Sequence, residues 1–207
     1  MERPGTYRYI TTKFPMNKIY QFPFLGNRQY LHGTTLFDSL RTLVPKGASV
    51  HFKISEMIES DCVEITDSEK DVRPNAVLYW KSATNEGRIS IYAQLASKEI
   101  QRQEYDEQSI DKQVIISEKE AVFSGISPYS FIATIIPIHK KLLKNCIQPE
   151  QPGQWFFTRL VLDTIPESFQ HVTLKFIAVI GKQLAKSEIA VDGGRIGEMY
   201  FSWKRAE

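Results

Sequence analysis

YLHGTTLFDSL, at residues 30–40, and VFSGISPYSFI, at residues 122–132, follow one plan. In each stretch an extended apolar segment leads to a glycine, Gly33 or Gly125, and then to a helix-start signal and an apolar helix. The same order of elements at two places in a chain is typical of an internal repeat. The two stretches therefore predict that this chain encodes one structural unit twice.

A second pair of matching segments supports the repeat. Gly87-Arg88-Ile89 recurs as Gly194-Arg195-Ile196. A tight-turn signal lies at each of these places, at residues 85–87 and at residues 192–194. The Gly-Arg-Ile segment lies further from the glycine before the helix in the second copy than in the first. We place the extra residues in the loop at 145–154, because prolines and a glycine interrupt that segment.

Each half has the same predicted order of elements: a strand, a helix and then four antiparallel strands. Ser127 is the expected N-cap of the second helix, Pro128 suits its first position, and Pro137 is expected to kink it. The apolar spacing predicts helices at 35–43 and 127–144, first-half strands at 18–24, 50–54, 61–66, 76–81 and 88–96, and second-half strands at 113–117, 155–162, 171–179, 184–191 and 195–203.

The composition is that of an ordinary globular protein. The chain has 207 residues, of which 42% are hydrophobic and 24% charged, which argues against a disordered or fibrous chain. Lys and Arg number 26 against 24 Asp and Glu, for a net charge of +2. This balance does not indicate a nucleic-acid or membrane partner. The chain is long enough for one large domain or two small ones.

The sequence predicts a cytoplasmic protein. Its N-terminal residues lack the apolar core of a signal peptide, and its longest apolar stretch, residues 129–138, is shorter than the roughly 20 residues of a membrane span. Two cysteines, Cys62 and Cys146, cannot build a disulfide framework. The cysteines and the four histidines also lack metal-ligand spacing, and no glycine-rich phosphate loop occurs, so we expect no metal and no cofactor.

The element order, the duplication and the glycine before each helix resemble the hotdog fold in its tandem, or double, form. The resemblance covers residues 17–203 and implies an α+β protein with hotdog units at 1–105 and 106–207, joined by a linker at 102–111. In this family the two units pair edge to edge into one continuous antiparallel sheet, and their helices pack together. Such pairing removes an open sheet edge and buries two apolar helices.

The resemblance implies a protein that acts on acyl thioesters of coenzyme A or of acyl carrier protein. Hotdog proteins are thioesterases, dehydratases or hydratases, and some are non-catalytic binders. Their sites lie at the seam between units, where a helix N-terminus polarises the thioester carbonyl. On this basis His32 and Asp38 are the candidate catalytic residues, and the candidate substrate-binding residues are Gly33, Thr34, Ser124, Gly125 and Ser130.

Both catalytic candidates have an alternative structural interpretation. His32 precedes the first helix, where it can act as a base or can simply cap the helix. Asp38 lies within an apolar helical segment, where burial would raise its pKa, or it faces solvent on an amphipathic helix. Aligning Gly33 with Gly125 places His32 opposite Ser130 and Asp38 opposite Ser124. Neither seam site then holds the pair of histidine and carboxylate that dehydratases of the family use.

The sequence therefore favours a thioesterase-like hydrolase over a dehydratase, and a non-catalytic acyl-binding module is the main alternative. The dehydratases' glycine-histidine-phenylalanine-proline signature is absent, because the chain reads His32-Gly33-Thr34. Ser124 would need a neighbouring base to be a nucleophile, and the sequence indicates none. His139, Lys140, Lys141 and Lys144 form a basic helix end that suits the helix dipole or contacts phosphates of coenzyme A or an acidic carrier protein. The tandem unit is expected to be a monomeric pseudo-dimer or a homo-oligomer of it.

Overall fold

The computed structural model describes residues 17–148, 151–181 and 183–205. The first part of the chain contains β1 (Lys18–Gln21), β2 (Phe24–Leu25), α1 (Gly33–Arg41), β3 (Ser49–Ile54), β4 (Cys62–Thr66), β5 (Ala76–Lys81), β6 (Glu86–Ala93) and β7 (Arg102–Gln103). The second part contains α2 (Glu107–Asp111), β8 (Val114–Ser117), β9 (Glu120–Ser124), α3 (Phe131–Cys146), β10 (Gly153–Leu162), β11 (His171–Ile180), β12 (Leu184–Val191) and β13 (Gly194–Arg205).

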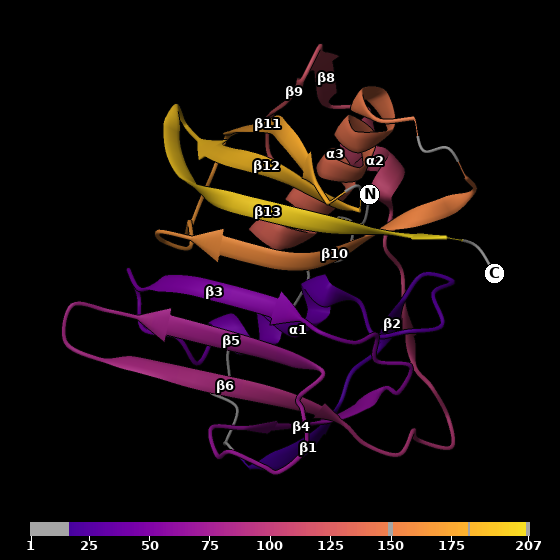
Figure 1. Ribbon diagram of the computed structural model, residues 1–207, viewed down its shortest axis with the longest axis vertical. Helices are drawn as coiled ribbons and strands as arrows, with labels where there is room; N and C mark the ends of the chain where they lie inside the picture. Colours follow the sequence, from indigo (N-terminus) through magenta and orange to yellow (C-terminus); the bar gives the residue numbers. More distant parts are fainter. Residues whose placement is uncertain (1–16, 149–150, 182, 206–207) are drawn as a thin grey trace, which may run out of the picture.

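One continuous sheet runs through both parts (Figure 1). Its eleven described strands lie in the order β1-β4-β6-β5-β3-β10-β13-β12-β11-β9-β8, and every neighbouring pair is antiparallel. The two parts meet where β3 pairs with β10, with Phe52 opposite Leu160 and His51 opposite Val161. This pairing leaves neither inner strand with an open edge. We call the region around the β3–β10 pair the seam.

The two parts do not repeat each other strictly. In the second part, β11, β12 and β13 are consecutive neighbours, and the last strand, β13, lies beside the seam strand β10. In the first part it is β5 that lies beside the seam strand β3, while β6, the last strand that this part contributes to the large sheet, pairs with β4. The recurring Gly-Arg-Ile segments thus lie in β6 and β13, which occupy different places in the sheet. In both parts four strands of the sheet follow a long helix, but the arrangement of the last two of these strands is reversed.

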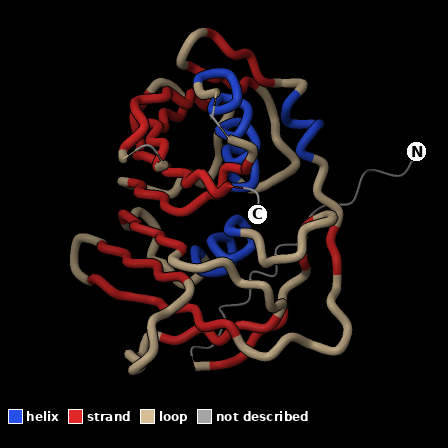
Figure 2. The backbone as a smooth tube through the Cα atoms, turned by 45° about the vertical axis from the view of Figure 1, so that its right-hand side comes forward, coloured by secondary structure: helices blue, strands red, loops and turns tan. Residues whose placement is uncertain are grey.

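Both long helices lie within the curve of the sheet, and α1 contacts α3 (Figure 2). Leu36, Phe37 and Leu40 of α1 are buried, and α3 is apolar around most of its circumference. These side chains join those of the inner sheet face in one hydrophobic cluster that spans both parts of the chain. A helix that is apolar nearly all round must be buried on several sides. Contact with α1 and the surrounding strands provides this burial for α3.

The second helix begins later than the sequence predicted. The expected start was Ser127, but α3 begins at Phe131 and its N-cap is Ser130, whose Oγ accepts a hydrogen bond from the N–H of Ala133 at 3.2 Å. The Ser127 hydroxyl instead accepts from the N–H of Tyr129 in the preceding turn. Two serines three residues apart offer equivalent capping signals, and packing of the following apolar residues selects the second.

Pro137 lies inside α3 and is compensated by a side chain from the connecting segment. Proline has no N–H to donate to the carbonyl four residues earlier, which belongs to Ala133. The Tyr105 hydroxyl donates to that carbonyl oxygen at 2.5 Å. The segment expected to be a plain linker, residues 102–111, therefore contains β7, α2 and this contact. It fastens the start of the second part to the middle of α3.

His139 does not behave as the cation that its place near a helix end suggested. It is fully buried beneath the sheet, where its Nε2 lies 2.7 Å from the Ser187 hydroxyl and its ring lies 4.5 Å from that of Phe201. Burial lowers the pKa of His139 to about 3, so the imidazole is neutral near pH 7. The expectation failed because His139 lies on the face of α3 that packs against the sheet, where Ser187 and Phe201 enclose it.

Candidate functional site

A pocket of about 90 Å³ lies at the seam and receives side chains from both parts of the chain. The first part supplies the residues before and within α1 and the loop after β3, and the second part supplies α3, β10 and the end of β13. Tyr30, Trp155, Phe156 and Phe157 give it an aromatic wall, and Lys140, Lys204 and Glu56 are its charged residues. His32 and Gly33 line it at the N-terminus of α1.

His32 is a buried, neutral imidazole at the start of α1. It is the N-cap residue, but its side chain makes no capping hydrogen bond to the helix. Its Nδ1 lies 2.8 Å from the Thr34 hydroxyl, which is its one hydrogen bond among the described residues. Burial lowers the pKa of His32 well below its usual range, and the charges of Arg28 and Lys140 lower it further. The ring is therefore unprotonated near pH 7 and is held by Thr34.

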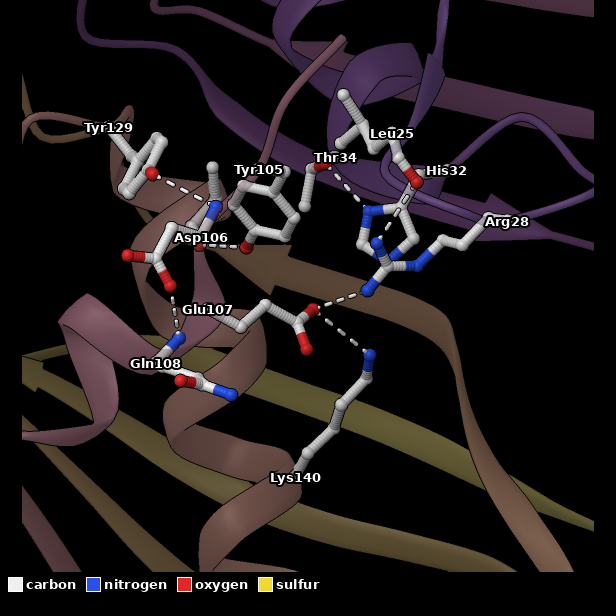
Figure 3. A network of polar contacts seen from close by, with 11 residues as sticks. Leu25, Arg28, His32, Thr34, Tyr105, Asp106, Glu107, Gln108, Tyr129 and Lys140 are labelled. Carbon is white, nitrogen blue, oxygen red and sulfur yellow. Dashed lines mark hydrogen bonds and ion pairs between the residues drawn. The ribbon is translucent and has the colours of Figure 1, made fainter. Parts of the chain in front are cut away.

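A charged network lies beside His32 and links the two parts of the chain. Figure 3 shows Arg28 and Lys140 pointing toward the carboxylate of Glu107 on α2. Glu107 Oε1 lies 2.5 Å from Arg28 Nη2 and 3.4 Å from Lys140 Nζ. Arg28 also lies over the ring of Tyr105, with 5.5 Å to the ring centre. The charges near His32 are thus cations that share one carboxylate.

The expected facing pairs across the seam are wrong. His32 does not face Ser130, and Asp38 does not face Ser124. Instead Asp38 Oδ2 accepts a hydrogen bond of 2.5 Å from the Ser130 hydroxyl. Aligning the two glycines caused the error, since His32 and Ser130 are both N-caps and thus equivalent positions, whereas Gly125 precedes its helix by several residues.

Asp38 connects α1 to the start of α3. Its carboxylate is 12% exposed, accepts from Ser130 and forms an ion pair with Arg41 on its own helix, with 3.3 Å between Oδ1 and Nε. Burial raises the pKa of Asp38 to about 6, although Ser130 and Arg41 oppose the shift. This agrees with the expected effect of an apolar environment on the group. Asp38 is not among the residues that line the pocket.

We expect Asp38→Asn to stabilise the protein more at pH 8 than at pH 4. A carboxyl whose pKa is raised on folding favours the folded state below its unfolded pKa, and this contribution is lost as the pH rises through about 6. Asparagine retains an acceptor for Ser130 but cannot ionise. The difference in free energy of unfolding between variant and wild type should change by roughly 2.5 kcal/mol between the two pH values.

Denaturant unfolding of both proteins at pH 4 and pH 8 measures this change. A difference that does not vary with pH would show that Asp38 titrates normally. Turnover of the same variant distinguishes two roles for the residue. A catalytic carboxylate predicts its loss, whereas a residue that only joins α1 to α3 predicts that turnover remains.

Gly33 and Thr34 stand at the seam for distinct reasons. A Cβ on Gly33 would lie 2.7 Å from both Ile54 Cδ1 and Phe157 Cδ1, so any larger residue would force these side chains of β3 and β10 to shift. Thr34 is buried and supplies the hydroxyl beside His32. Because no side chain caps α1, the first N–H groups of the helix remain available to a ligand.

Ser124 and Gly125 lie away from the pocket. Ser124 ends β9 and is exposed, and its hydroxyl lies 3.0 Å from Nδ1 of His171 on the paired strand β11. The sequence indicated no base near Ser124, because pairing of β9 with β11 brings the two together only in the folded sheet. The N–H of Gly125 donates to the Gln170 carbonyl at 2.9 Å. Neither residue lines the seam pocket.

Sequence reasoning missed Arg28, Tyr105 and Glu107. Arg28 and Glu107 are 79 positions apart, and no local pattern relates them. The basic cluster at the end of α3 did include Lys140, but nothing distinguished it from Lys141 and Lys144.

In the described part of the chain, no group of His, Cys, Asp or Glu side chains has an arrangement suited to a metal ion. None of the described helices has the length and apolar character to cross a membrane.

Several solved structures are similar to this chain at low identity. A candidate thioesterase II from Thermobifida fusca shares 10% identity over 93% of this chain and 99% of its own, with a TM-score of 0.45. A trans-AT polyketide synthase dehydratase domain from Brevibacillus brevis shares 9% over 98% and 100%, with a TM-score of 0.47. The PpsC dehydratase domain from Mycobacterium tuberculosis, solved with C12:1-CoA, shares 7% over 90% and 93%, with a TM-score of 0.49.

No family model matches the chain, and no curated protein matches it. The three solved structures have TM-scores below 0.5 and identities of 7–10%, so their activities do not extend to this chain.

Proposed function

We propose that this chain is a tandem hotdog protein, with units at 1–105 and 106–207, that hydrolyses an acyl thioester of coenzyme A or acyl carrier protein. The observation that carries this proposal is a seam pocket into which both parts of the chain project and at which a neutral histidine begins a helix. The class of substrate follows from the resemblance of the sequence to the hotdog family.

In this proposal His32 acts as the general base. Its neutral imidazole takes a proton from water as the water oxygen attacks the thioester carbonyl carbon. The first N–H groups of α1 stabilise the negative charge that develops on the carbonyl oxygen. When the carbon–sulfur bond breaks, the imidazolium returns its proton to the departing thiolate, so the products are a carboxylic acid and a thiol. Thr34 holds the imidazole in place.

A non-catalytic acyl-binding module is the second candidate. The binding module is favoured by the low pKa of His32, which makes the imidazole a weak base, and by the cationic rather than acidic neighbours of the ring.

A dehydratase is less well supported, because its second catalytic group would be a carboxylate from the opposite helix. On the described part of α3, the charged side chain at the pocket is instead Lys140.

A screen of acyl-coenzyme A and acyl-carrier-protein thioesters of increasing chain length tests the proposal. Hydrolysis is followed by release of free thiol, and binding by a shift in melting temperature, because a ligand that binds only the folded state raises its stability. We expect both signals for at least one thioester. A thermal shift without thiol release would identify the binding module, and the absence of both signals would rule out either function.

A further inference from the structure

The seam pocket contains a cation that the proposed hydrolysis does not use. Lys140 lines the pocket from α3, and its side chain is 22% exposed. Its one ion-pair partner among the described residues is Glu107, 3.4 Å away. The same carboxylate oxygen lies closer to Arg28, at 2.5 Å. Glu107 therefore neutralises Arg28 first and leaves Lys140 only partly compensated.

The surroundings do not remove this excess of positive charge. Asp111, the other acidic side chain of α2, is influenced by Lys141 and Lys144 as well as by Lys140. The two acidic side chains of α2 thus stand among four basic ones, and the pocket lining itself holds Lys140 and Lys204 against one carboxylate, Glu56. Burial lowers the pKa of Lys140, which indicates that its ammonium group is poorly hydrated. A poorly hydrated, partly compensated cation at the edge of an apolar pocket attracts an anion, because ion pairs strengthen as water is excluded.

The size of the pocket limits the ligand that reaches Lys140. Pockets that bury drug-sized molecules have volumes of about 300–1,000 Å³, whereas this one is about 90 Å³. A long acyl chain would not fit within it. At the same time, the aromatic wall formed by Tyr30, Trp155 and Phe156 suits a short run of methylene groups.

We propose that the seam pocket selects a short acyl group that ends in a free carboxylate, and that this carboxylate pairs with Lys140. The inference rests on the proposed function and names its substrate class. The thioester carbonyl lies at His32 and the N-terminus of α1, and the far end of the acyl chain lies at α3. The α1–α3 contact thus sets the length of acyl group that can reach from His32 to Lys140.

Two pantetheine analogues test the inference, a succinyl one and a butyryl one, in which an unreactive amide replaces the thioester. They have the same chain length and differ in the terminal carboxylate. We expect the wild type to bind the succinyl analogue about tenfold more tightly, in line with a hydrogen bond to a charged group. Lys140→Met should abolish most of this preference. Lys144→Met, which removes an exposed lysine one turn along the same helix, should retain it.

The possible results separate the inference from the proposed function. If neither analogue binds although the thioester screen finds a substrate, the preference for a short carboxylate-ended group is refuted and the proposed function stands. If the screen also finds no substrate and no ligand, the proposed function itself is refuted. If both bind equally well, the pocket accepts acyl groups but the preference for a carboxylate is refuted. If the succinyl preference survives in Lys140→Met, another group provides it and the assignment to Lys140 fails. The wild-type preference requires no variant, so it can be measured even if a substitution impairs folding.

Discussion

His32→Ala should reduce thioester hydrolysis by about 10²-fold or more, the usual contribution of a general base. The imidazole is buried at the start of α1, and no other described histidine lines the pocket. Water in the variant would have to attack without a base. The rate of thiol release, measured on a substrate found in the thioester screen, reports this loss.

His171→Ala is the matched control for this variant. It also removes an imidazole that lies close to a hydroxyl, but on the exposed face of β11 and away from the pocket. We expect it to retain wild-type turnover. Circular dichroism and melting curves of both variants show whether they fold. A folded His32→Ala protein with full activity would exclude the proposed mechanism.

The pH dependence of the wild type provides a second measurement on His32. Because its pKa lies well below the usual range, the imidazole stays unprotonated as the pH falls from 8 to 6. The hydrolysis rate should therefore not decline through protonation of this base over that interval. A rate that halves near pH 6.5 would indicate a histidine with an ordinary pKa.

Gly197→Ala should destabilise the fold by about 3 kcal/mol, at the upper end of the usual cost of overpacking. Gly197 lies in β13 between β10 and β12, opposite Leu162 and Ile189. A Cβ at this position would overlap the carbonyl oxygen of Val161 and approach the Leu162 Cα to 2.9 Å. Both atoms belong to the backbone of the seam strand β10, which cannot move away without disturbing its pairing with β3. Denaturant unfolding measures the loss.

Gly193→Ala separates this close approach from the general cost of replacing a glycine. Gly193 lies in the β12–β13 turn at φ +84°, and a Cβ added there would meet no side chain or backbone beyond its chain neighbours within 4 Å. Its substitution should cost only about 1 kcal/mol, the strain of a left-handed residue. Equal losses for the two variants would mean that crowding against β10 is not the reason for Gly197.

Local patterns predicted the elements better than their pairing. The strands at 76–81 and 184–191 have the predicted bounds, since alternation and the adjoining turns specify them within a few residues. The hairpin formed by β5 and β6 is equally clear in the sequence. Its orientation beside β3 is not, because either strand of the hairpin presents an apolar inner face to the same core.

In the candidate site, too, the sequence predicted residues that local signals mark but not the contacts between distant residues. His32 and Gly33 were found from the sequence because a helix start is a local signal, and they do line the seam pocket. The sequence left two alternatives for Asp38, a buried carboxyl with a raised pKa or a solvent-facing one, and the structure buries it and raises its pKa. Its partner Ser130 was assigned to His32 instead, because the sequence aligned Gly33 with Gly125, although the two glycines lie at different distances from their helix N-caps.

By itself, the sequence determined the order of the main strands and of the two long helices, the apolar faces of these helices, and the glycine at the start of the first one. These properties depend on neighbouring residues, and periodicity and backbone preference record them directly. Only the tertiary structure decided the pairing of β3 with β10, the sharing of Glu107 by Arg28 and Lys140, and the neutral states of His32 and His139. Charge and protonation depend on burial and on side chains distant in sequence, which meet only when the two parts of the sheet join.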